Sequence, residues 1–302
     1  MAQPSIDSPE HLFVRVIKLR RFALLTMVAI ALPALPARAT DSGIYTIVDG
    51  DVRVLRGATW FRLVPGARLL EGDVVEVGEQ GQAQLELMEG ATLNLQGPAA
   101  MHVVSTAMPD GKAAAIDEIV VARGWLKAAA AKGRPLRLRM STMTTTVANV
   151  VVVASCDARR TELFIESGAT SVALPRGKDA PREAKTGEFA ARVDDRALVV
   201  ENRAPAAFLT AIPRPFRDAL PALAGRFAVA PEALVKGRDI SLAEADPWLA
   251  GANRKSFVKR FTPRLADPAF RVAVAARPST YPEWDRIIHP EKYRPKETTD
   301  AK

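Results

Sequence analysis

The chain has 302 residues, of which 48% are apolar and 25% are charged, so it can bury a core and is not globally disordered. Its formal net charge is +8, and basic residues outnumber acidic ones by 12 to 6 between positions 247 and 302. The chain between position 40 and that region is close to neutral. A positive excess confined to one end argues against a nucleic-acid-binding domain and leaves attraction to an anionic surface open.

Residues 1–39 have the three-part pattern of a secretory signal peptide. A positive region precedes the apolar stretch 22–32, and small residues follow at Ala37 and Ala39, the positions that a signal peptidase reads. We therefore expect cleavage between Ala39 and Thr40, a periplasmic mature chain and no nucleic-acid partner. The alternative is an inner-membrane anchor formed by 22–37, although 16 residues with two prolines are short for a bilayer span.

Between residues 43 and 104, strand-like stretches alternate with glycine turns at short intervals. Residues 81–87 alternate small or apolar side chains with polar ones, and residues 92–96 resume the pattern after a turn at Glu89-Gly90. Alternation with a period of two predicts strands with one buried face. Glycine and proline in the intervening pairs favour turns.

A second β-like block follows. The run of four valines at 150–153 predicts a strand that is buried on both faces. Residues 163–165 and 172–174 flank a turn at Ser167-Gly168 and predict a hairpin. We assign 43–200 to a mainly β domain and expect it to be solenoid- or roll-like. Periodicity alone does not distinguish these folds from a sandwich.

The remaining residues, 201–302, are predicted to form a smaller α-helical region that is rich in proline and aromatic residues. Ser241 and Glu244 match a capping box, and Asp267-Pro268 places a cap residue before a first-turn proline. Phe257 and Phe261 lie four residues apart and would share one helix face.

Aromatic side chains gather in this last region, and two readings stay open for them. They either pack back on the β domain or form a docking surface, because exposed aromatic residues are typical interface anchors. The candidate partner-contact residues are Trp248, Phe257, Phe261, Tyr281, Trp284 and Tyr293.

The sequence shows no pattern of residues that is typical of a catalytic or metal-binding site. His102 and His289 are far apart and lack metal-ligand spacing. The single mature cysteine, Cys156, follows an apolar strand and is interpreted as a buried structural thiol. A hydrolase or transpeptidase that uses Cys156 is the minor alternative. We expect no enzyme activity, no catalytic residue, no cofactor and no metal.

Several segments in a fixed order resemble the FecR domain of bacterial envelope proteins. They are residues 70–75 (LEGDVV), 81–87 (GQAQLEL), 89–98 (EGATLNLQGP), 121–126 (VARGWL) and 164–169 (FIESGA). The resemblance implies a periplasmic, all-β, solenoid-like module. In the best-known members this module receives a signal from an outer-membrane receptor and passes it to a cytoplasmic anti-sigma segment.

The chain departs from that family pattern in two places. About 20 residues precede the apolar stretch, which is too few for a cytoplasmic regulatory domain, so we expect a free-standing exported version. The family often has a Gly-Thr pair at the start of a late strand, where this chain has Ala148-Asn149-Val150.

These observations favour a non-enzymatic periplasmic protein-interaction module with a regulatory or scaffolding role in the cell envelope. Its expected partner is another envelope protein. The alternative is an accessory protein that binds peptidoglycan or another glycan, since sugars are held by exposed aromatic rings beside polar groups. The candidate rings for that role are Trp60, Trp125, Trp248 and Trp284.

Overall fold

The computed structural model describes residues 41–87, 90–104, 117–130, 135–176, 179–227, 234–251 and 253–293. All of them belong to one compact unit of the chain, Ala39–Lys302. The expected leader, its cleavage site at Ala39 and Thr40 and the alternative anchor at 22–37 lie outside the described residues. Among the described residues, no helix has the length and apolar character needed to cross a membrane.

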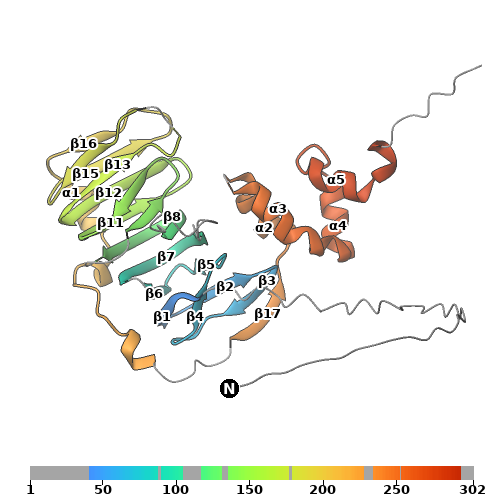
Figure 1. Cartoon of the computed structure of the whole chain (residues 1–302), viewed down its shortest axis with the longest axis horizontal. Coiled ribbons are helices and arrows are strands. Elements are labelled where there is room, and N and C mark those ends of the chain that lie inside the picture. Colours follow the sequence, from blue (N-terminus) through green and yellow to red (C-terminus); the bar gives the residue numbers. More distant parts are fainter. Residues whose placement is uncertain are drawn as a thin grey trace, which may run out of the picture. The chain divides into compact units, whose positions relative to one another are not determined.

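The described residues are mainly β, with short helices toward the C-terminal end (Figure 1). The strands are β1 (Asp41–Asp49), β2 (Val52–Arg56), β3 (Thr59–Arg62), β4 (Arg68–Leu70), β5 (Val74–Val77), β6 (Gln82–Leu87), β7 (Ala91–Val104), β8 (Asp117–Ala130), β9 (Leu136–Arg139), β10 (Thr144–Val147), β11 (Val150–Cys156), β12 (Arg160–Ser167), β13 (Ala169–Ala173), β14 (Arg182–Lys185), β15 (Phe189–Val193), β16 (Val199–Glu201) and β17 (Val235–Asp239). The helices are α1 (Ala206–Ala211), η1 (Arg214–Phe216), η2 (Ala224–Phe227), α2 (Leu242–Ala250), α3 (Arg254–Phe261), η3 (Thr262–Ala266), α4 (Pro268–Ala275), α5 (Pro282–Ile288) and η4 (Pro290–Tyr293).

Three long strands, each bent once, form the antiparallel meander at the upper left of Figure 1. β10 and β11 make up the first, β12 and β13 the second, and β14 and β15 the third. β12 registers with β11 and β15, whereas β13 registers with β10 and β14. The predicted hairpin between 163–165 and 172–174 is therefore wrong, because the chain only bends at Gly168 and continues in the same direction along its partners.

Residues with positive φ make these bends possible. Asn149, Gly168 and Gly187 have φ values of 52°, 88° and 85°. Glycine adopts this left-handed region freely, and asparagine tolerates it better than most residues. The bends are in contact: the Gly168 amide donates to Thr186 Oγ1 at 2.9 Å, and a Cβ on Gly168 would lie 2.5 Å from the Asn149 carbonyl oxygen.

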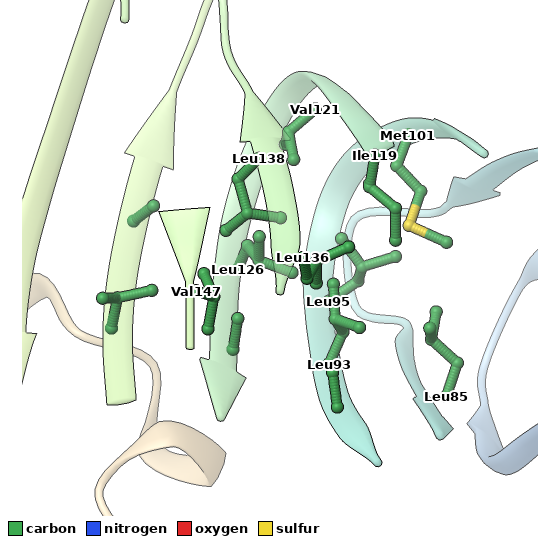
Figure 2. Close-up of a cluster of buried hydrophobic side chains, with 14 of the residues drawn as sticks. Leu85, Leu93, Leu95, Met101, Ile119, Val121, Leu126, Leu136, Leu138 and Val147 are labelled. Carbon is green, nitrogen blue, oxygen red and sulfur yellow. The ribbon is translucent and has the colours of Figure 1, made fainter. Parts of the chain in front are cut away.

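The main core lies between the inward faces of the strands (Figure 2). Apolar side chains from β6 to β10 point toward one another there, among them Leu85, Leu93, Leu126, Leu138 and Val147. Alternate residues of β6, β7, β8 and β9 supply this core, as the period-two pattern predicts. Burial of so many aliphatic side chains is the dominant stabilising term, at roughly 25 cal/mol per Å² of apolar surface.

Outward residues of β6, β7 and β8, among them Gln84, Asn94 and Lys127, are also buried, which the sequence did not predict. A segment that we name the crossing segment (residues 205–227) runs over them. Lys127 of β8 is 1% exposed, and its Nζ donates to the Phe216 and Asp218 carbonyls at 2.8 and 2.9 Å and lies 2.7 Å from the Glu166 carboxylate. A buried ammonium is tolerated only when it is paired and hydrogen-bonded in this way.

β6 holds the next part of the crossing segment. The Gln84 amide donates to the Pro221 carbonyl at 2.8 Å, and the Glu86 carboxylate accepts the amides of Leu223 and Ala224 at 2.6 and 3.1 Å. The crossing segment is therefore fixed to the sheet through its own backbone, so its apolar side chains contribute only part of the attachment.

The C-terminal helices begin where the sequence predicted. Ser241 and Glu244 form a reciprocal capping box at the start of α2, and Asp267 accepts the amides of Ala269 and Phe270 at the start of α4. Phe257 and Phe261 share one face of α3, with ring centroids 5.6 Å apart.

The mainly β class with a smaller helical C-terminal region is confirmed, and solenoid-like winding is not shown. Stacked coils of a parallel solenoid would pair strands in parallel, whereas β8 with β9 is the one parallel pair among the registers of the described strands. The last region also contains a strand, β17, which pairs with β3 and has every residue exposed. Its sequence, VKGRD, lacks the alternation that would have predicted it.

The bends give a testable consequence for stability. Gly168→Ala should lower the free energy of unfolding by about 3 kcal/mol, because the left-handed backbone costs about 1–2 kcal/mol and the new Cβ collides with the Asn149 carbonyl. Gly187→Ala is the matched control, since Gly187 has a similar φ but open space around it, and it should cost about 1–2 kcal/mol. Urea unfolding measures both values. Equal losses for the two variants would show that the contact between bends is not tight.

Candidate functional site

The helices are fastened to the outer face of β2, β3, β5 and β7. Arg260 of α3 donates from its Nε, Nη1 and Nη2 to the backbone carbonyls of Gly57, Gly72 and Leu55, respectively. Removal from water lowers the pKa of Arg260 to about 10, and the nearby Asp73 carboxylate opposes this shift. The guanidinium thus donates to carbonyls of β2 and of two turns of the sheet, and it fixes the position of α3.

A second core surrounds this anchor. Leu55, Trp60, Val74 and Ala100 of the sheet pack in one cluster with the buried rings of the helices. The rings are Trp248, Phe257, Phe261, Phe270, Tyr281 and Trp284. Such a contact leaves the helical region little freedom to move without exposing aromatic surface.

A pocket of about 650 Å³ remains where the helices and the sheet diverge. Its floor comes from β7, β8 and β9, one wall comes from α2 and α3, and the rim comes from the loops after β9, β11, β13 and β15. This volume is in the range of small-molecule sites.

The pocket is lined by more positive than negative groups. Arg139, Arg176 and Arg192 line it, together with one carboxylate, that of Asp195. The Arg192 side chain is 12% exposed, and it donates to the carbonyls of Thr142 and Arg196 at 2.9 and 2.8 Å. Its Nη2 lies 3.9 Å from Asp195, too far for a hydrogen bond.

One of the terminal nitrogens of Arg139, Nη2, has two partners. Its Nη2 lies 3.0 Å from both the Asn253 Oδ1 and the Glu118 carboxylate. Its Nε is buried and has no hydrogen-bond acceptor among the described residues. Buried donors are almost always paired, so this group is an exception within the site.

His102 of β7 forms the floor beside two aromatic rings. Its ring centroid lies 4.8 Å from that of Phe257 and 6.3 Å from that of Trp248, and its Nδ1 is 3.4 Å from the Asn253 amide nitrogen. Burial lowers the pKa of His102 to about 4, and the positive charges of Arg260 and Arg139 add to this effect. The imidazole is therefore neutral at neutral pH, and with the Asn253 amide donating to Nδ1 its proton is on Nε2.

Five of the six candidate partner-contact residues are buried. Trp248, Phe257, Phe261, Tyr281 and Trp284 have between 0% and 7% of their surface exposed, and they belong to the cluster that packs against the sheet. Tyr293 is 48% exposed, and its hydroxyl donates to Asp285 at 2.7 Å. Five of the six rings therefore pack back on the β domain, which was one of the two alternatives. Trp248 and Phe257 also line the pocket.

The other residues that the sequence singled out lie outside this site. Cys156 is buried, its thiol donates to the Val121 carbonyl at 3.5 Å, and burial raises its pKa to about 12, as suits a structural thiol. His289 lies 3.2 Å from Glu291 near the end of α5. Trp60 is buried beneath Arg53, whose guanidinium carbon is 4.1 Å from its ring centroid. Within the described ranges, no three His, Cys, Asp or Glu side chains form a group that could hold a metal ion.

Sequence reasoning missed the arginines of the pocket. The signal for Arg139 was its outward position in the alternating strand β9, where Leu136 and Leu138 face the core. Arg176 and Arg192 come from a loop and a distant strand, and only the folded chain brings them near Arg139.

No family model matches the chain, and no curated protein sequence matches it either. Two crystal structures described as a "putative anti-sigma factor" from Parabacteroides distasonis ATCC 8503 are distantly similar to it. In each case the identity is 12%, the TM-score is 0.36, and the alignment covers 43% of this chain and 59% of that chain. The chain thus matches less than two thirds of that protein's length.

His102 makes a testable contribution to the pH dependence of stability. Its pKa is about 4 when folded and 6.5 in the reference state, so the unfolded chain binds more protons between these values. The contribution of the neutral ring to the free energy of unfolding is fully present above pH 6.5 and is lost as the pH falls toward 4. Denaturant titrations should therefore show a loss of about 2 kcal/mol between pH 7 and pH 5.

The variant His102→Gln should lack most of this loss, while the control His289→Gln should retain it. If His102→Gln keeps the full pH dependence, the buried neutral imidazole is not its source.

Proposed function

We propose that this chain is a non-enzymatic interaction module of the bacterial cell envelope, of the FecR type, with a regulatory or scaffolding role in the periplasm. The pocket between the sheet and the C-terminal helices carries this proposal. It combines positive groups, polar groups and aromatic walls in one concave site, which is the usual composition of a recognition site. A solenoid-like description of the β domain belongs to the same proposal and rests on the resemblance of the segments in 70–169.

The rigidity of the site supports a role in binding. Arg260 and the aromatic cluster hold the helices, and two backbone carbonyls hold the side chain of Arg192. Groups that are already positioned lose little conformational entropy when they bind a partner.

An exposed strand next to the helices offers a second contact to a protein partner. Among the described strands, β17 registers with β3 alone, and all five of its residues are exposed. A strand with a free edge can accept an extended segment of another protein through backbone hydrogen bonds. This mode would suit an envelope protein partner, because it needs little sequence-specific chemistry.

A glycan-binding accessory protein is the second candidate, and Trp248 favours it. Its indole ring lines the same pocket as three guanidinium groups and the Ser141 hydroxyl. Aromatic faces beside polar groups suit sugar rings, and peptidoglycan supplies both sugars and carboxylates.

Affinity capture tests the leading proposal. The full-length chain, tagged at its C-terminus and produced in its native host, should recover the same envelope protein in replicate extracts. Arg176→Glu should reduce the recovery severalfold, because it reverses an exposed charge at the pocket rim. Cys156→Ala should leave the recovery unchanged.

Recovery of no reproducible protein beyond that of an unrelated tagged periplasmic protein would contradict the leading proposal. Co-sedimentation with purified peptidoglycan then tests the second candidate function. A glycan-binding protein should enter the pellet with the peptidoglycan.

A further inference from the structure

We infer that the pocket is a carboxylate-binding site, and that its ligand is a small molecule or chain end in which a carboxylate is attached close to a ring or an apolar group. This inference rests on the proposed function, which assigns recognition to the pocket, and it names the chemistry that is recognised. An acidic sugar and the C-terminal carboxylate of a peptide share this chemistry.

The charge of Arg192 is the first reason. Its side chain is largely buried and is held by two backbone carbonyls, which accept hydrogen bonds but carry no net charge. The nearest carboxylate, that of Asp195, is fully exposed and 3.9 Å away. A largely buried guanidinium whose neighbouring carboxylate is exposed and 3.9 Å away is stabilised by an incoming anion, to which Nη2, the nitrogen that does not donate to these two carbonyls, can donate.

The surroundings of Arg192 add further positive charge and polar groups. The Nη2 of Arg139 contacts both Glu118 and Asn253, and its buried Nε has no acceptor among the described residues. Arg176 is exposed at the rim. A ligand oxyanion would therefore be attracted at the mouth and meet a fixed guanidinium inside.

The apolar residues of the pocket explain the second part of the ligand. Pro247, Trp248 and Phe257 line the helical side, and Val120 and Ala122 line the sheet side. A bare inorganic anion would leave this apolar surface uncovered, whereas a ring or an aliphatic group would bury it. The volume of about 650 Å³ admits a sugar acid or the last two residues of a peptide.

Calorimetric titration of the purified full-length chain tests the inference with two matched pairs of probes. The first pair is N-acetylmuramic acid and N-acetylglucosamine, which differ by a lactyl carboxylate. The second pair is the N-acetylated dipeptide Phe-Ala with a free carboxylate and its C-terminal amide. The acid of at least one pair should bind about tenfold or more tightly than its uncharged counterpart, as one charge-assisted pair of hydrogen bonds allows. The pair that responds identifies the source, and inorganic phosphate should bind more weakly than that acid.

Two variants and a control link the binding to this pocket. Arg176→Gln should weaken the acid severalfold and Arg192→Gln about tenfold or more, whereas Arg271→Gln, which removes an exposed positive charge on α4, should leave the affinity unchanged. Because Arg192 also holds two loops, the melting temperature of its variant is measured in parallel, and Arg176→Gln tests the pocket at a residue without that role.

Equal binding of acids and uncharged counterparts, no binding of either acid, or equal effects of Arg176→Gln and Arg271→Gln would overturn the inference. A chain that captures an envelope protein but binds neither acid would retain the proposed function and lose only this ligand chemistry. A chain that binds an acid but captures no protein would retain the carboxylate-binding pocket and lose the proposed protein-interaction function.

Discussion

The structure depends on the contact between the Arg260 guanidinium and three backbone carbonyls of the sheet. The Leu55 carbonyl belongs to strand β2, that of Gly57 to the turn between β2 and β3, and that of Gly72 to the turn between β4 and β5. The Asp73 that follows Gly72 is buried and paired with Arg56 at 3.0 Å. The end of β2 and these two turns are therefore where the helical region attaches to the sheet, and the pocket exists because α3 is held there.

The C-terminal third of the chain covers the outward surface of the β region in two places. The crossing segment is fixed over β6 to β8 by Lys127, Gln84 and Glu86, and the helices then cover β2, β3, β5 and β7 through the aromatic cluster. Polar groups fix the first contact and apolar rings the second. Two parts of the outward surface of the strands are thereby removed from water, so this part of the chain belongs to the fold, and the recognition site lies at its border with the sheet.

Local patterns predicted the local structure well. Period-two alternation identified the inward residues of β6, β7 and β9, and the capping residues Ser241 and Asp267 marked two helix starts, because these features depend on near neighbours in the sequence. The failures concern long-range contacts. Outward Gln84 and Glu86 look solvated until a segment more than 130 residues later covers them. The arginines of the pocket come from three separate elements, so no spacing in the sequence could reveal them.

Hydrogen exchange followed by mass spectrometry tests the central claim most directly. If Arg260 joins the helices to the sheet, amides of α3 and of β8 should open with the same free energy in the unmodified chain, and Arg260→Met should lower both together by about 2–4 kcal/mol, since three carbonyls lose their donors. An α3 that already opens at a much lower free energy than β8, with the strands unaffected by Arg260→Met, would contradict the account. In that case the helical region would be an independent appendage, and the pocket would not be a fixed site.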